Sequence, residues 1–462
     1  MKQRYQSING ITEGIIWKQL LVFFFPLLFG TFFQQLYNTV DAIVVGRFAG
    51  KEALSAVGGT TGTLINLLVG FFIGISSGAT VIISQYFGAG DEENVSKAVH
   101  TSIALAIAGG FIIMIIGLIG APTALKWMGT PEEIMPYSLQ YIRIYFAGMI
   151  ANLVYNLGSG ILRAIGDSRR PLYFLIVACI INIILDLVFV VVLHWDVIGV
   201  ALATVISQIV SAGLVCLSLM SSYECYKLDL KKIRFDSNIL KKTIMIGLPA
   251  GFQSLMYSTS NTLIQASINS FGTDTIAAWT AYAKIDSLFW MVLGSFGISA
   301  TTFVGQNFGA GKNDRVRKGV RTCISLSMAS AVIISLVVNF CGEFFYQLFT
   351  KDSAVIKIGL EILHFITPTY FTFVAVEILS GSLRGMGSTL IPMLITGIGI
   401  CALRVVWILT AVPIWHSIKT VVFSYPLTWV VTSVFFIIYY MYFIKKNNIE
   451  EIPQTLHFRV EG

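Results

Sequence analysis

The stretch QYFGAG at residues 85–90 closes a long apolar segment, and a near copy, QNFGAG, closes another at residues 306–311. A second pair of similar stretches follows, SGILRAIG at residues 159–166 and SGSLRGMG at residues 380–387. Both pairs are offset by 221 residues (85 to 306 and 159 to 380). Self-similarity at a fixed offset indicates an internal repeat, so the chain consists of two related halves.

The composition places both halves in a lipid bilayer. The chain has 462 residues, of which 55% are hydrophobic and 12% are charged, whereas soluble domains average about 25% charged residues. Its mean hydropathy is +0.78. These values exclude a disordered chain, a secreted disulfide scaffold and a nucleic-acid-binding protein.

Apolar segments of about 20 residues, the length that crosses a bilayer, recur along the whole chain. They predict an all-α polytopic membrane protein with twelve transmembrane helices. The expected spans cover roughly residues 16–45, 57–86, 98–120, 134–162, 171–193, 197–220, 240–270, 275–304, 319–341, 354–383, 391–412 and 417–444.

Lysine and arginine residues set the predicted orientation. They concentrate near both termini and in the loops after even-numbered spans. The densest cluster lies between the sixth and seventh spans: Lys227, Lys231, Lys232, Arg234, Lys241 and Lys242. Cytoplasmic loops carry the excess of Lys and Arg, so both termini are predicted to be cytoplasmic. The same rule accounts for the net charge of +7.

The repeat and the spans together predict two six-helix lobes. The N-terminal lobe covers residues 1–220, a linker loop 221–240, the C-terminal lobe 241–445 and a cytoplasmic tail 446–462. Six is an even number, so both lobes enter the membrane in the same orientation and are related by a pseudo-two-fold axis along the membrane normal. Transporters of this design hold their substrate between the lobes and rock them to alternate access.

Polar residues at membrane depth mark the expected coupling site, because ionisable groups within a span are costly and usually functional. Such residues share a helical face within each span: Gln34, Tyr37, Asn38 and Asp41 in the first, Asn152 and Asn156 in the fourth, Asn182 and Asp186 in the fifth, and Thr204 and Gln208 in the sixth. Two carboxylates among amides and hydroxyls suit the uptake of a proton or of Na⁺, a hard cation that takes oxygen ligands. Two simpler roles stay open: Asp41 as a helix cap paired with Arg47, and Asn182 as a hydrogen-bonding bridge between helices.

The second half lacks carboxylates at the equivalent positions but keeps polar residues within its spans. Gln253, Tyr257 and Asn261 form a stripe at a spacing of four in the seventh span. Glu377 lies within the tenth span and is interpreted as a partner of Lys284 or Arg404, or as a contact for a cationic substrate.

Pro26 lies within the first span, 15 residues before Asp41. A proline inside a helix frees a carbonyl group and kinks the helix. A kinked helix that carries a titratable group would act as a hinge, and a static kink is the alternative.

Together these residues resemble the prokaryotic multidrug and toxic compound extrusion (MATE) family. The resemblance rests on the two six-span halves, on residues 85–90, 162–166 and 182–186, and on their order and spacing, and it covers about residues 13–445. It implies a V-shaped pair of six-helix bundles and an antiporter that exchanges cytoplasmic drugs or metabolites for H⁺ or Na⁺.

The resemblance also implies roles for individual residues. A cation-coupling site in the N-terminal lobe, which would hold H⁺ or Na⁺, is expected at Asp41, Asn182, Asp186 and Thr204. The substrate cavity is expected to include Gln34, Tyr37, Asn38, Tyr141, Asn152, Asn156, Gln208, Gln253, Tyr257, Asn261 and Glu377. A bend of the first helix at Pro26 is the expected response to protonation. Another branch of the family has Glu where Tyr257 stands, so a sodium site in the C-terminal lobe is not expected.

The sequence thus predicts a secondary antiporter of the bacterial plasma membrane, not an enzyme. It would export cationic or amphipathic drugs or toxic metabolites in exchange for H⁺ or Na⁺. It is expected to act as a monomer without a cofactor or an ATPase subunit. The sequence contains no Walker A pattern, so it encodes no ATP-driven motor.

Two alternatives belong to other classes. A flippase for lipid-linked precursors should line its cavity with several Arg or Lys residues, whereas the polar positions of the first half are acidic and amide-rich. An intramembrane enzyme would use the two Asp residues as acid and base, and the two-fold repeat and the lack of a water-activating motif disfavour it.

Overall fold

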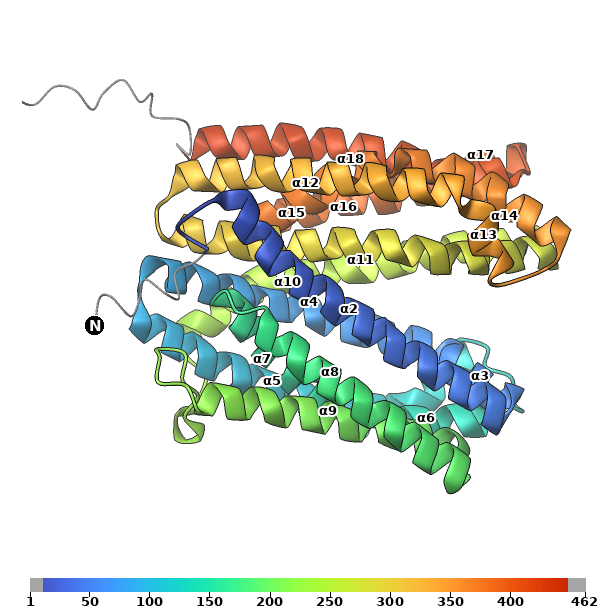
Figure 1. Ribbon diagram of the computed structural model, residues 1–462, viewed down its shortest axis with the longest axis horizontal. Coiled ribbons are helices and arrows are strands. Elements are labelled where there is room, and N and C mark those ends of the chain that lie inside the picture. The colour runs from blue at the N-terminus through green and yellow to red at the C-terminus, as the bar shows by residue number, and fades with distance from the viewer. Residues whose placement is uncertain (1–10, 448–462) are drawn as a thin grey trace, which may run out of the picture.

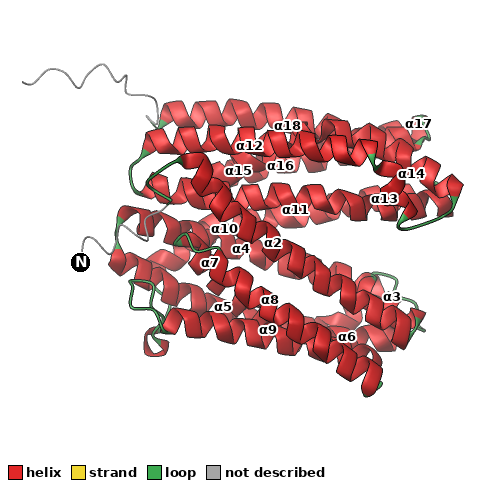
Figure 2. Cartoon of the chain, in the orientation of Figure 1, coloured by secondary structure: helices red, strands yellow, loops and turns green. Residues whose placement is uncertain are grey.

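The computed structural model describes residues 11–447, and all regular elements among them are helical (Figure 2). The helices form two bundles that meet at one end and splay apart at the other, which is the predicted V shape (Figure 1). The tail predicted at residues 446–462 lies outside the described residues, apart from its first two positions.

The N-terminal bundle contains α2 (Ile16–Val44), η1 (Val45–Ala49), α3 (Lys51–Gly58), α4 (Thr60–Ala89), α5 (Glu92–Trp127), α6 (Met135–Ala147), α7 (Met149–Ala164), α8 (Arg169–Asp186), η2 (Leu187–Val192) and α9 (Asp196–Met220). A short turn of helix, η3 (Leu230–Lys232), lies in the segment between the bundles.

The C-terminal bundle contains α10 (Ser237–Asn269), α11 (Thr273–Gly309), α12 (Asn313–Phe340), α13 (Gly342–Gln347), α14 (Ser353–Ile366), η4 (Thr367–Phe373), α15 (Val374–Gly385), α16 (Leu390–Thr396), η5 (Gly397–Ala402), α17 (Leu403–Ile414) and α18 (Ile418–Lys446).

Length and composition support ten membrane-spanning helices among residues 11–447, or eleven if α6 and α7 form one span bent by 49°. The remaining helix of the predicted twelve is α10, which is 33 residues long but has no stretch apolar enough to be counted with the others. Its polar stripe of Gln253, Tyr257 and Asn261 accounts in part for that difference.

The repeated glycines are explained by the backbone. Gly90 and Gly311 end the two copies of FGAG at φ angles of 72° and 69°, and Gly166 and Gly387 end the second repeated stretch at 97° and 88°. Side chains rarely tolerate this left-handed region, so glycine terminates each of these helices. The sequence repeat is therefore a repeat of helix-ending turns.

The first helix of each bundle crosses to the other bundle. The first part of α2 packs on the C-terminal bundle, where Phe24 stacks on Phe296 with ring centroids 4.0 Å apart, and α2 then runs diagonally to the N-terminal bundle (Figure 1). Conversely, Ile246 near the start of α10 belongs to the N-terminal core, whereas Ile264 near its end belongs to the C-terminal core. The two crossings follow the same pseudo-two-fold relation as the sequence repeat.

Glycines allow the crossing helices to approach closely. A Cβ atom on Gly74 of α4 would lie 2.5 Å from the Cα atom of Gly251, and one on Gly78 would lie 2.7 Å from the nitrogen of Gly247. No larger residue fits such backbone contacts. This contact joins the two bundles along α4 and α10.

The bundles also meet where α4 and α11 end, a region that we call the vertex. A Cβ atom on Gly88 would lie 2.0 Å from the carbonyl oxygen of Gln306, and one on Gly309 would lie 2.0 Å from that of Gln85. The repeated motif therefore forms a reciprocal backbone contact between the two halves.

The glutamines of the repeated motif close the same region with hydrogen bonds. Gln85 Nε2 donates to the carbonyl oxygen of Gly385 at 2.8 Å, and Gln306 Nε2 donates to that of Ala164 at 2.6 Å. Each bond starts in one bundle and ends at the last turn of a helix in the other. The structure therefore represents a state in which the vertex is closed.

Candidate functional site

The polar residues predicted for cation coupling come together inside the N-terminal bundle. Asp41 lies near the end of α2, Asn182 and Asp186 lie in the last turns of α8, and Thr204 lies on α9. All four are buried, and Asn182 and Asp186 have no exposed surface. The side chain of Asp41 faces the side chains of the other three, and Thr204 Oγ1 lies 3.5 Å from Asp41 Oδ2. Helices distant in the sequence thus converge on one cluster, which we call the acid cluster.

Several atoms of the acid cluster have no hydrogen-bond partner. They are Asp41 Oδ1, both carboxyl oxygens of Asp186, and the side-chain oxygen and nitrogen of Asn182. Two facing carboxylates have no hydrogen to share, and burying unpaired oxygens is costly. A proton or a small cation between them would remove that cost.

No basic side chain neutralises the acid cluster. Within residues 11–447, neither Asp41 nor Asp186 forms an ion pair, and Arg47 is exposed. The alternative in which Asp41 pairs with Arg47 therefore has no support in the geometry. The side chains of the acid cluster offer hard oxygen ligands, which suit Na⁺ or H⁺. Within residues 11–447, no group of three His, Cys, Asp or Glu residues could hold a metal ion.

A turn of wider π-helix follows each of the two aspartates. The segment η1 follows Asp41 after three residues, and η2 begins directly after Asp186. Single π-helical turns are rare and frequently occur at functional sites. They mark α2 and α8 as the helices whose backbone departs from regular geometry at the acid cluster.

Tyrosine side chains cover one side of the acid cluster. Tyr37, Tyr141 and Tyr145 all lie close enough to interact electrostatically with Asp41. Tyr141 and Tyr145 stack one turn apart, with ring centroids 6.1 Å apart. Tyr145 was not among the predicted residues, although its spacing of four from Tyr141 places both on one face of α6.

The other predicted cavity residues of this bundle lie at different places. Gln34 and Asn38 are exposed on α2, whereas Oε1 of Gln208 is buried without a partner. Asn156 Nδ2 donates to Asn152 Oδ1 at 3.0 Å, so these two amides partly satisfy each other. The predicted set therefore does not form one continuous cavity.

A pocket of about 290 Å³ lies between the two bundles, and we call it the inter-lobe pocket. The predicted residues Asn156, Gln253, Tyr257 and Glu377 line it. Tyr141, Asn152, Gln208 and Asn261 are not among its lining residues, and neither are Gln34, Tyr37 and Asn38. Helices α4, α7, α10, α11 and α15 contribute its walls, so a bound compound would touch both lobes.

Two arginines that the sequence interpretation counted as loop charges also line the inter-lobe pocket. Arg163 comes from α7 and Arg384 from α15. Arg384 Nη2 donates to Gln253 Oε1 at 3.3 Å, and its charge interacts with Glu377. The basic residue that interacts electrostatically with Glu377 is therefore Arg384, rather than Lys284 or Arg404 as expected. The sequence repeat is the signal that could have identified Arg163 and Arg384 as pocket residues, because both arginines occupy the same position in the two copies.

Arg404 and Asp286 have local roles in the C-terminal bundle. Arg404 donates to Asn261 Oδ1 at 3.2 Å and lies 4.5 Å from the ring centre of Tyr425. Asp286 accepts hydrogen bonds from Trp290 Nε1 at 2.6 Å, from the Tyr282 hydroxyl at 3.2 Å and from the Tyr370 hydroxyl at 2.5 Å. Both charges are thus held by neighbouring polar and aromatic groups.

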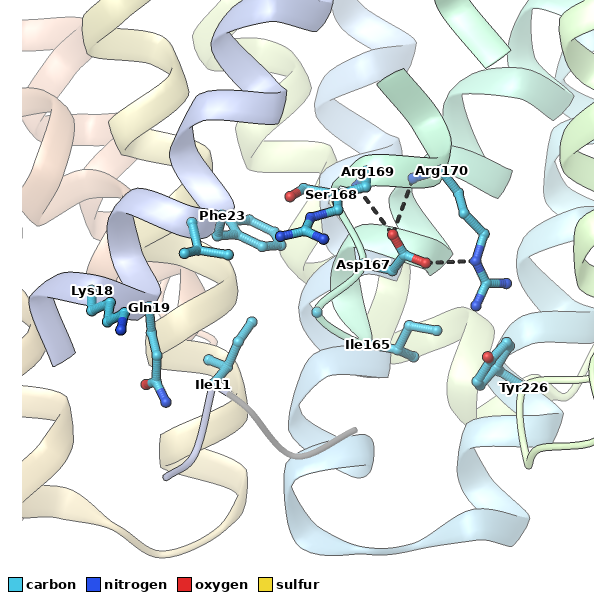
Figure 3. A pocket seen from close by; sticks show the side chains of 12 residues that line it. Ile11, Lys18, Gln19, Phe23, Ile165, Asp167, Ser168, Arg169, Arg170 and Tyr226 are labelled. Carbon is cyan, nitrogen blue, oxygen red and sulfur yellow. Dashed lines mark hydrogen bonds and ion pairs between the residues drawn. The ribbon is translucent and has the colours of Figure 1, made fainter. Parts of the chain in front are cut away.

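A second pocket, of about 560 Å³, lies where α2 and α8 begin. Figure 3 shows Lys18 and Gln19 on its α2 side and Asp167, Arg169 and Arg170 on its α8 side. Asp167 accepts hydrogen bonds from the backbone of Arg169 and Arg170 and pairs with the Arg170 side chain at 2.6 Å. None of the predicted site residues lines this pocket, and its polar groups organise the turn that starts α8.

Comparison with known proteins identifies one family along both halves of the chain. The profile of the family described as MatE matches residues 26–188 and 249–410, one block in each half. The chain is similar to the probable multidrug resistance protein YoeA of Bacillus subtilis (strain 168), with 28% identity over 450 residues, which cover 95% of this chain and 96% of YoeA. It is 25% identical over 391 residues to the probable multidrug resistance protein NorM of Thermotoga maritima, with 84% of each chain covered.

The fold is also that of a solved transporter. A MOP superfamily transporter from Pyrococcus furiosus Vc1 superposes with a TM-score of 0.89 at 20% identity, covering 96% of this chain and 98% of that one. At this level of identity, the similarity supports the fold alone.

Proposed function

The chain belongs to the MatE family of multidrug efflux transporters, and from that premise we propose that it is a secondary antiporter driven by H⁺ or Na⁺. Members of the family are multi-pass membrane transporters rather than enzymes, so the open questions concern the coupling ion, the substrate and the orientation. The proposal places the protein in a bacterial plasma membrane as a monomer with both termini in the cytoplasm. The proposed lobes cover residues 1–220 and 241–445, with a linker at residues 221–240 and a cytoplasmic tail at residues 446–462.

The observation that carries the proposal is the acid cluster. Asp41 and Asp186 face each other without a basic neighbour and with unpartnered oxygens. Binding of H⁺ or Na⁺ would relieve the repulsion between the two carboxylates, and Asn182 and Thr204 would supply further oxygen ligands. Because α2 also packs on the C-terminal lobe, a change at its end alters a helix that both lobes share. Pro26 lies inside that helix, and we propose it as the hinge.

The proposed cycle couples the acid cluster to the inter-lobe pocket. In the closed-vertex state the ion binds at Asp41 and Asp186, and the substrate leaves from between the lobes on the outer side. Substrate and ion need no shared contact, but each must favour a different state. The expected substrates are cationic or amphipathic drugs or toxic metabolites, for which Tyr257 and Glu377 would provide aromatic and acidic contacts.

The test is efflux of a fluorescent cationic dye from proteoliposomes under an imposed pH or Na⁺ gradient. We expect one gradient to drive transport by the unmodified protein, which identifies the coupling ion, and Asp41→Asn to abolish the driven component. Asp314→Asn removes an exposed carboxylate on α12 and is the matched control. Normal gradient-driven transport by Asp41→Asn would show that the coupling site lies elsewhere.

One observation favours the lipid-linked precursor flippase as the second candidate. Arg163 and Arg384 bring two positive charges into the inter-lobe pocket, and a phosphate-bearing lipid needs such charges. Glu377 offsets one of them. If the protein moves no dye under either gradient but translocates a fluorescent polyprenyl phosphate, the flippase replaces the antiporter.

A further inference from the structure

We propose that the inter-lobe pocket binds the carboxylate or phosphate group of an amphipathic organic compound, with Arg163 as its principal contact. The inference deepens the proposed transport function and rests on it, because it concerns the substrate of the same pocket. It adds an anionic group to the expected substrate class, whether or not the compound also carries a positive charge.

The first argument is that Arg163 has no carboxylate partner. In the part of the chain that the structure describes, no Asp or Glu lies within ion-pair distance of its guanidinium, and the group that interacts with its charge is the hydroxyl of Tyr155. Arginine stays charged in proteins, and a poorly solvated charge without a partner is costly. An anionic ligand in the pocket would supply the missing partner.

The second argument comes from the repeat. Arg163 and Arg384 are equivalent positions, and the residue equivalent to Glu377 in the first half is Asn156 (377 to 156 and 384 to 163, both offset by 221). In the second half the acid faces its arginine. In the first half a neutral amide stands in the same place and bonds to Asn152 instead. The pocket therefore contains one guanidinium that interacts electrostatically with a carboxylate and one that does not.

The third argument is the charge and shape of the pocket. Two guanidinium groups and one carboxylate leave one net positive charge among Arg163, Arg384 and Glu377. The walls also contain Ile73, Ile298 and the ring of Tyr257, which would contact the apolar part of a compound. Most of the side chains that line this pocket of about 290 Å³ are polar, so it suits a small organic molecule that carries both polar and apolar groups.

The test compares dansylglycine with its methyl ester, which has the same fluorophore but no charge. Binding is measured by fluorescence titration of the protein in phosphatidylcholine nanodiscs, without any ion gradient. We expect the unmodified protein to bind the acid at least about tenfold more tightly than the ester, because charge-assisted hydrogen bonds are the strong ones. Arg163→Gln should remove this preference while leaving ester binding unchanged, and Arg163→Lys should retain part of it.

Two further variants separate the inference from misfolding. Arg143→Gln removes an exposed arginine of α6 outside the pocket and should leave the preference intact. Glu377→Gln frees Arg384 and should strengthen the binding of the acid relative to the ester, a gain that a misfolded protein cannot show. Equal binding of acid and ester by the unmodified protein, or an undiminished preference in Arg163→Gln, would overturn the inference.

A second series identifies the source of the anionic group. Phosphatidylglycerol in the nanodiscs can compete with the acid for the pocket. If it weakens binding of the acid more strongly in the unmodified protein than in Arg163→Lys and Arg163→Gln, the bilayer supplies the phosphate. If phosphatidylglycerol has no effect, the natural ligand is a soluble compound. Both results concern only the source of the anionic group, because the comparison of acid and ester tests the site itself, and neither depends on dye transport. A protein that prefers the acid but transports nothing under a gradient would refute the antiporter and leave the site in place.

Discussion

Gly309→Ala should shift the protein away from the closed vertex. The added Cβ atom would lie 2.0 Å from the carbonyl oxygen of Gln85, 2.7 Å from its carbonyl carbon and 2.8 Å from its Cα atom, where ordinary contact begins at 3.4 Å. All three are backbone atoms, so no side-chain rotation relieves the clash and the two lobes must separate. Overpacking of this kind costs about 1–3 kcal/mol, which corresponds to a population shift of about 5- to 150-fold.

The assay is a pair of spin labels at the open end of the V. Lys51→Cys on the N-terminal lobe and Lys351→Cys on the C-terminal lobe, in a variant without the six native cysteines, would report the distance between the lobes. Opening of the vertex should bring the labels closer, so the shorter distances should gain population in Gly309→Ala.

Gly294→Ala is the matched control, since it lies in the same helix and its Cβ atom would meet nothing within 4 Å. Alanine gains at most about 1 kcal/mol of helix propensity over glycine at either position, and only Gly309→Ala adds the clash. An unchanged distance distribution in a folded Gly309→Ala protein would refute the idea that this contact holds the vertex closed.

Further predictions concern the vertex, the buried acid of the C-terminal lobe and a helix cap. Gln85→Ala and Gln306→Ala should each favour vertex opening by about 1 kcal/mol, the net value of one hydrogen bond, and together by about twice that. The same spin labels measure this opening. An unchanged distance distribution in the double variant would show that the two hydrogen bonds are dispensable. Asp286→Asn places an amide against three hydrogen-bond donors and should destabilise the C-terminal lobe by about 1–3 kcal/mol. The ion dependence of transport should stay unchanged. Loss of that ion dependence in a stable variant would contradict a structural role for Asp286. Asp91 caps α5 and accepts hydrogen bonds from Asn94, which hold the pKa of its carboxyl below the usual range. Its contribution is therefore present at neutral pH and lost as the pH falls through this lowered pKa, so the loss of about 1 kcal/mol in Asp91→Ala should shrink as the pH falls below the usual range of an aspartate. Thermal unfolding between about pH 7 and pH 2 checks this, and an equal loss at both ends would show that the titrating carboxyl is not the cause.

The architecture followed from the sequence because the repeat is local and exact in spacing. Helix-ending turns such as Gly90 and Gly311 need glycine wherever they occur, so they leave a legible mark in both halves. Polar residues one turn apart within apolar segments also leave such a mark, which is how the polar faces of single spans were found. The grouping of Asp41, Asn182, Asp186 and Thr204 into one site came from the resemblance to the MATE family.

The contents of the inter-lobe pocket were harder to predict. An arginine near a helix end, such as Arg163 or Arg384, has the same sequence signature whether it faces the water outside or a pocket between lobes. Only the tilt of α7 and α15 against the opposite lobe decides between the two, and tilt depends on packing that no local pattern encodes. For the same reason, Glu377 was assigned to Lys284 or Arg404 rather than to Arg384, which lies two turns along its own helix.

The crossing of α2 and α10 has a consequence for the origin of the chain. In each half, the first part of the first helix packs in the core of the other half. This is the geometry of a domain-swapped dimer contained within one polypeptide. A half-length chain on its own would leave the receiving surface uncovered and the first part of its own first helix without a core to pack on. We therefore expect the two halves, expressed as separate chains, to be recovered only as a complex, as two subunits of an ancestral dimer would have been before their genes fused.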